Sequence, residues 1–193
     1  MKLSHLFSST VIASLLIASA SSFAQNYTIE PNHTFPSFEA DHMGISVWRG
    51  KFTKTSGKVT LDRTAKTGSV DITIDTNSLD FGHAKMNDHG KNKDMFNVEK
   101  FPTAVFKGKT IKFNGDNPAS VEGEFTLLGV TKPLTLTINK FKCIMHPMMK
   151  KEVCGADASA TFNRADFGMT YAVNWGFSPE VKLAIQVEAV KAD

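Results

Sequence analysis

Alternation of apolar and polar side chains is the feature of this sequence that most restricts its fold. In the segment VKLAIQV, the residues Val181, Leu183, Ile185 and Val187 fall on one face of an extended chain. The same period of two recurs in three further segments: VDITID from residue 70, VEGEFTL from residue 121 and LTLTIN from residue 134. Such alternation, rich in β-branched and aromatic residues, predicts antiparallel strands with one face against an apolar interior.

Less regular stretches bring the expected number of strands to about eight. These stretches are residues 27–40, 50–62, 104–113 and 156–162. Eight strands are enough for a closed antiparallel barrel that is filled by side chains or by one small ligand. A two-sheet sandwich fits the same pattern. The polar segment HAKMNDHGKNKDMF, residues 83–96, has few β-forming residues and predicts a short helix or a long loop.

The N-terminus has the three parts of a secretory signal peptide. Lys2 precedes an apolar run over residues 11–20, and Ser22, Phe23 and Ala24 form a small-residue cleavage pattern. The run is shorter than the roughly 20 residues of a membrane-spanning helix. We therefore expect a signal peptide over residues 1–24 and one exported domain over residues 25–193, either periplasmic or secreted.

Charge and aromatic content narrow the class of function. The net charge of +3 at pH 7 is small and evenly spread, which argues against a nucleic-acid partner. The 15 phenylalanines include several that lie close together in the sequence. They fit either a packed core or the lining of a lumen for an apolar ligand, and composition does not separate these two interpretations.

Four segments together resemble the YceI-like family of exported lipid-binding barrels. They are IEPNHTFPSFEADHMGISVWRGKF, IDTNSLDFGHAKMNDHGKNKDMFNVEKFPTAVF, GEFTLLGVTKPLTL and NRADFGM, and in this order they span nearly all of residues 26–190. The resemblance implies a lipocalin-like antiparallel barrel whose lumen binds a long apolar molecule, typically a polyprenyl or quinone tail. It implies no catalysis and no cofactor.

Ten apolar residues are the candidates for the lining of such a lumen. They are Phe35, Phe38, Phe52, Phe106, Phe125, Leu127, Leu136, Ile138, Phe162 and Trp175. We expect a lipophilic partner of isoprenoid, quinone or fatty-acid-like type, held for transport, storage or sequestration. Transient contact with a membrane is compatible with this role. The sequence leaves the oligomeric state open.

Polar residues near the expected mouth are candidates for contacts with a ligand head group. They are His42, Arg49, His83 and His89. With Asp88, the two histidines of the 83–96 segment also suggest an acid–base or metal site, although this spacing matches no known catalytic motif. Structural roles, head-group contacts and an uncharacterised enzyme are therefore three interpretations of the same cluster.

Both cysteines of the chain lie in the segment CIMHPMMKKEVC, at positions 143 and 154. Disulfides form and persist outside the cytoplasm, so an exported chain favours a Cys143–Cys154 bridge around a loop. The alternatives are redox activity or an extracytoplasmic copper site that uses thiolates, His146 and the neighbouring methionines. Oxidation to the disulfide would leave such a site only the histidine and thioethers.

Overall fold

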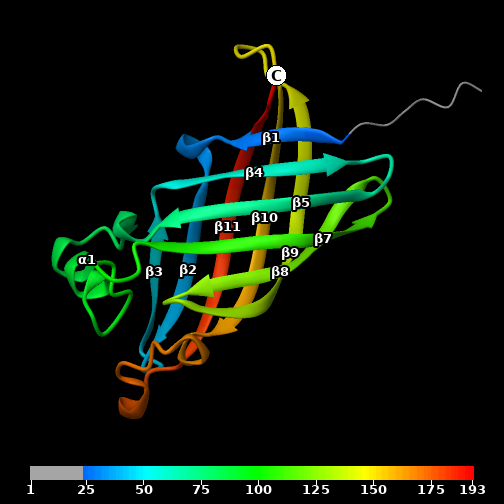
Figure 1. Cartoon of the computed structure of the whole chain (residues 1–193). Coiled ribbons are helices and arrows are strands. Elements are labelled where there is room, and N and C mark those ends of the chain that lie inside the picture. Colours follow the sequence, from blue (N-terminus) through cyan, green and yellow to red (C-terminus); the bar gives the residue numbers. More distant parts are fainter. Residues whose placement is uncertain (1–23) are drawn as a thin grey trace, which may run out of the picture.

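Antiparallel strands dominate residues 24–193, which are the residues that the computed structural model describes. The strands are β1 (Gln25–Ile29), β2 (Phe35–His42), β3 (Ser46–Phe52), β4 (Thr55–Asp62), β5 (Thr67–Asp75), β6 (Leu79–Asp80), β7 (Thr103–Asn114), β8 (Asn117–Leu127), β9 (Val130–Met145), β10 (Glu152–Asn163) and β11 (Glu180–Lys191). Figure 1 shows β1, β4, β5 and β7 crossing the long strands β9, β10 and β11.

Eight of these strands form a closed ring in the order β1-β4-β5-β7-β8-β9-β10-β11. The ring closes because β1 also pairs with β11, where Tyr27 lies opposite Lys191. Closure satisfies the backbone hydrogen bonds that an open sheet leaves at its edges. The predicted all-β barrel of about eight strands is thus confirmed, and the sandwich alternative is excluded.

The remaining segments extend three strands of the ring past a common bend. The segment β2 follows β1, β3 precedes β4, and β6 follows β5. Short interruptions separate β1 from β2, β3 from β4 and β5 from β6; two are the 3-10 turns η1 (Pro31–His33) and η2 (Thr76–Ser78). Across the bend, the Thr53 amide donates to the Ser78 carbonyl at 3.1 Å. The predicted strands 27–40 and 50–62 are therefore each two segments. In the first, Pro31 lacks an N–H, and Glu30 caps the turn by accepting the Asn32 amide.

The alternating segments face the barrel interior as their pattern predicts. In β11, Val181, Leu183 and Ile185 line the interior, and the matching residues of β5, β8 and β9 do the same. Gly108 and Gly123 lie opposite each other beside an irregularity in the β7–β8 register. A Cβ on Gly123 would lie 2.4 Å from the Lys107 carbonyl oxygen, so the close approach of these two strands requires glycine.

Besides η1 and η2, residues 24–193 contain three more short helical elements. The helix α1 (Ala84–Lys91) lies within the predicted 83–96 segment, and the turns η3 (Arg164–Phe167) and η4 (Val173–Trp175) lie between β10 and β11. Figure 1 shows the η3–η4 segment at one end of the long strands, with the β9–β10 turn and the C-terminus at the other.

No helix within residues 24–193 has the length and apolar character needed to cross a bilayer. The predicted signal peptide, residues 1–24, lies almost entirely outside the described residues.

Candidate functional site

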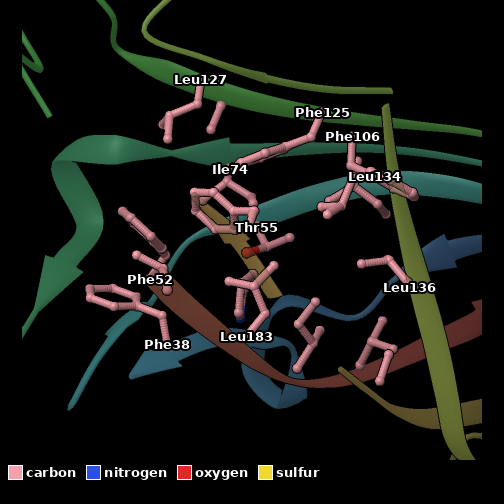
Figure 2. Close-up of a pocket in the computed structure, with 18 of the residues that line it drawn as sticks. Phe38, Phe52, Thr55, Ile74, Phe106, Phe125, Leu127, Leu134, Leu136 and Leu183 are labelled. Atoms are coloured by element: carbon pink, nitrogen blue, oxygen red, sulfur yellow. The ribbon is translucent and has the colours of Figure 1, made fainter. Parts of the chain in front are cut away.

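The barrel encloses an apolar cavity of about 560 Å³. This volume lies within the range of roughly 300–1,000 Å³ that is usual for small-molecule sites. Side chains from opposite walls point toward one another across it, among them Phe52, Phe106 and Leu183 (Figure 2). Burial of a charged group against these apolar side chains is costly, whereas burial of an apolar group is not.

All but one of the predicted lumen residues line this cavity. They are Phe38, Phe52, Phe106, Phe125, Leu127, Leu136, Ile138, Phe162 and Trp175. Figure 2 shows the first six of these projecting into a shared space. The structure therefore brings these residues together, and their contact with a ligand stays a prediction.

Phe35 is the exception, and its placement in the lumen has to be corrected. Pro36, Phe38 and Ala40 of β2 line the cavity, so Phe35 lies on the outer face of the same strand. Outside the barrel, the Lys51 ammonium lies 5.0 Å from the centre of the Phe35 ring. The physical reason is the period of two: Phe35 and Phe38 are three residues apart and cannot share a face in a regular strand.

Aromatic side chains surround the open end of the cavity. His42 stacks on Trp48 with ring centres 4.8 Å apart, and Phe177 meets His42 edge-on at 5.0 Å. Tyr171 contacts Trp175, which is 65% exposed although it lines the cavity. We call the opening bounded by these five residues the mouth.

The predicted head-group residues divide between the mouth and the outer surface. His42 and His89 line the cavity, and His89 packs against Tyr171 at 5.2 Å. Arg49 is exposed outside and pairs with Glu39 at 2.7 Å. His83 is exposed immediately before α1 and does not line the cavity.

Several lining residues were not predicted because they come from irregular segments. They are Phe81, Met86, Met95, Phe96, Arg164, Met169, Tyr171 and Phe177. Most of them lie on α1, on its flanking turns or in the 164–178 segment, where no periodicity indicates direction. Trp48 in the regular strand β3 also lines the cavity, and its spacing of four from Phe52 predicts this shared face.

The polar side chains deep in the cavity are few, and most are paired. The Tyr27 hydroxyl donates to the Glu152 carboxylate at 2.5 Å, and burial together with this carboxylate raises the pKa of Tyr27. The Thr34 hydroxyl donates to the Glu188 carbonyl and accepts from the Glu188 amide, each at 3.1 Å. Within residues 24–193, the Thr55 hydroxyl is the one buried side-chain oxygen or nitrogen without a hydrogen-bond partner.

The structure does not bring His83, Asp88 and His89 together at the cavity. Only His89 of the three lines the cavity, while His83 and Asp88 are exposed. In the described part of the chain, no three His, Cys, Asp or Glu side chains are grouped so that they could hold a metal ion.

The predicted disulfide between Cys143 and Cys154 is confirmed. The two residues lie directly opposite each other in β9 and β10, and two further residue pairs separate them from the turn at residues 146–151. This turn lies at the end of the barrel away from the mouth-forming η3–η4 segment (Figure 1). It therefore does not shape the mouth.

The same turn offers little to a copper ion. The Nδ1 atom of His146 accepts the backbone N–H groups of Met148 and Met149, at 3.3 and 3.2 Å. A neutral histidine that accepts at Nδ1 carries its proton on Nε2, so neither nitrogen has a lone pair free for a metal. With the cysteines paired, this arrangement does not favour the soft-metal alternative.

Comparisons with known proteins agree with this architecture. The model of the YceI-like domain matches residues 27–189. Protein YceI of Salmonella arizonae is 36% identical over 183 residues, which cover 93% of this chain and 94% of the relative.

Two solved structures share the fold. BcnA of Burkholderia cenocepacia superposes with a TM-score of 0.67 at 22% identity, covering 83% of this chain and 98% of BcnA. A polyisoprenoid-binding domain from Saccharophagus degradans gives a TM-score of 0.62 at 13% identity, covering 86% of this chain and 98% of that domain. At such identities the likeness concerns the fold alone.

Proposed function

The chain belongs to the YceI-like family, and from that premise we propose that its barrel binds a long apolar molecule of isoprenoid type. The observation that carries the proposal is the apolar cavity of about 560 Å³, whose lining includes the mouth residues His42, Trp48 and Trp175. The tail occupies the barrel interior and the head group stays at the mouth. No catalytic step and no cofactor are part of the proposal.

The energetics of hydrocarbon burial support a carrier or store. Transfer of a tail from water into the barrel gains about 0.8 kcal/mol for each methylene, so no strong polar anchor is required. Transfer from a bilayer gains almost nothing, because lipid tails are as apolar as the cavity wall. The fit to the cavity therefore decides which molecules are taken up, and the bound molecule can return to a membrane.

Exposed apolar side chains next to the mouth support ligand exchange by transient contact with a membrane. Ile45, at the turn between β2 and β3, is 78% exposed, and Trp175 forms part of the mouth itself. The Cys143–Cys154 disulfide supports an extracytoplasmic location for the mature chain, residues 25–193, because such bonds persist there.

Two adjacent positions of β10 provide a matched test. Ala158 lines the cavity, whereas Ser159 bonds to Asn139 on the exposed face. The variant Ala158→Trp places a large ring in the lumen, and Ser159→Trp places the same ring outside. We expect Ala158→Trp to weaken binding of geranylgeraniol about tenfold or more, which corresponds to the loss of about two buried methylenes. Ser159→Trp should bind like the wild type.

Native mass spectrometry and fluorescence titration measure this binding. Failure of the wild-type barrel to bind geranylgeraniol would refute the proposal. Equal binding by both variants would show that the molecule does not occupy the lumen.

A further inference from the structure

Arg164 is a buried cation in the wall of the cavity. It follows β10 directly and opens η3, within the segment NRADFGM. Only 7% of its surface is exposed, and it lines the cavity together with Phe162 and Met169. Arginine is almost never buried to this extent without an anionic partner, so the position requires an explanation.

The guanidinium points toward the segment that carries the mouth. Its Nη1 donates to the Met169 carbonyl at 2.8 Å, and its Nη2 donates to the Tyr171 carbonyl at 3.0 Å. Tyr171 is one of the aromatic residues of the mouth. Arg164 thus lies next to the entrance, where the proposed function places the ligand head group.

No carboxylate within residues 24–193 pairs with Arg164. None of the ion pairs found there involves Arg164. Among residues 24–193, Asp41 is the only acidic side chain that lines the cavity, and its Oδ2 accepts the Gly44 amide at 2.9 Å. Burial lowers the pKa of Arg164.

The guanidinium of Arg164 also has hydrogen-bond donors that these contacts do not use. A guanidinium has five N–H donors, and the bonds to Met169 and Tyr171 use two of them. Two carbonyl partners leave the buried positive charge uncompensated, and a buried charge is stabilised chiefly by an ion of opposite sign. An oxyanion fits this position because its oxygens match the planar fork of the guanidinium.

We propose that Arg164 binds an anionic head group, a phosphate or a carboxylate at the end of the apolar tail. This inference rests on the proposed function, since the tail in the barrel brings the head to the mouth. It makes the preferred ligand an anionic amphiphile rather than a neutral lipid of the same length.

Three compounds with one tail test the inference: geranylgeranyl monophosphate, geranylgeranoic acid and geranylgeraniol. Each is titrated into wild-type protein and into Arg164→Gln, below the concentration at which the compound aggregates. Hydrogen bonds to charged groups are stronger than those between neutral groups. We therefore expect the wild type to bind at least one of the two anions about tenfold or more tightly than the alcohol. Arg164→Gln should lose this preference, so that neither anion binds it more tightly than the alcohol does. The tighter of the two anions identifies the head group.

The outcomes separate the two proposals. If no compound binds to the wild type, the proposed function fails. If the alcohol binds as tightly as both anions, the barrel still holds a tail but the inference about Arg164 is refuted. An anion preference that survives in Arg164→Gln, or equal loss of all three compounds in a folded variant, also refutes it. If Arg164→Gln does not fold, a wild type that binds the alcohol as tightly as both anions still refutes the inference.

Discussion

Two buried threonines in the cavity wall should respond in opposite ways to replacement by valine, one with a gain and the other with a loss of stability. Thr34 is 2% exposed and makes two hydrogen bonds to the backbone of Glu188, whereas Thr55 is 4% exposed and its hydroxyl makes none. Valine has nearly the same shape as threonine and a similar preference for strands. The substitution Thr→Val therefore replaces the hydroxyl by a methyl group and changes little else at each position.

An unsatisfied buried hydroxyl costs about 1–3 kcal/mol, so Thr55→Val should stabilise the ligand-free barrel by about that amount. For a chain of this size, the corresponding rise in Tm is about 2–12 °C. Thr34→Val should lower stability by about 1–3 kcal/mol, because two hydrogen bonds are lost at a buried position.

Urea and thermal denaturation of delipidated protein measure both effects. A loss of stability in Thr55→Val that equals the loss in Thr34→Val would refute the reasoning, since the Thr55 hydroxyl would then have a partner in the folded protein. Geranylgeraniol binding by Thr55→Val should be unchanged or tighter, because the wall becomes fully apolar at this point.

Two further predictions concern the strands around the cavity. Replacing Cys143 and Cys154 by serine should lower stability by about 3 kcal/mol in the chain-entropy model, or about 6–12 °C in Tm. Cys154 lines the cavity but lies away from the mouth, so binding of geranylgeraniol should persist with at most a small loss; complete loss of binding or an unchanged Tm would contradict this. Gly123→Ala should destabilise the barrel by about 1–3 kcal/mol, since the new Cβ meets the Lys107 carbonyl oxygen at 2.4 Å. At Gly155 the nearest atom would be 3.5 Å away, so Gly155→Ala should be tolerated, and equal effects of the two alanines would refute the argument.

The barrel could be predicted from the sequence because its strands alternate regularly. In β11 the period of two from Val181 to Val187 gives both the strand and its inward face. The bend was not predictable in the same way. Glu30 and Pro31 interrupt the first strand through a side-chain cap and a missing N–H, which alternation does not record.

The mouth could not be predicted for a related reason. Tyr171 and Arg164 lie in a segment of 3-10 turns, where side-chain direction follows from individual hydrogen bonds and not from a period. Phe35 is predicted wrongly for a different reason. Its place among other phenylalanines suggests the lumen, but its odd spacing from Phe38 puts it on the outer face of β2.

The central claim is that the interior of the barrel is a binding site and not a dry core. Native mass spectrometry of the full chain, expressed with its own N-terminus and purified without organic solvent, tests this claim most directly. We expect a species heavier than the mature polypeptide by the mass of one lipophilic molecule, which extraction with hexane removes and which Ala158→Trp fails to retain. Detection of the bare polypeptide alone, together with no uptake of any of the three geranylgeranyl compounds, would contradict it.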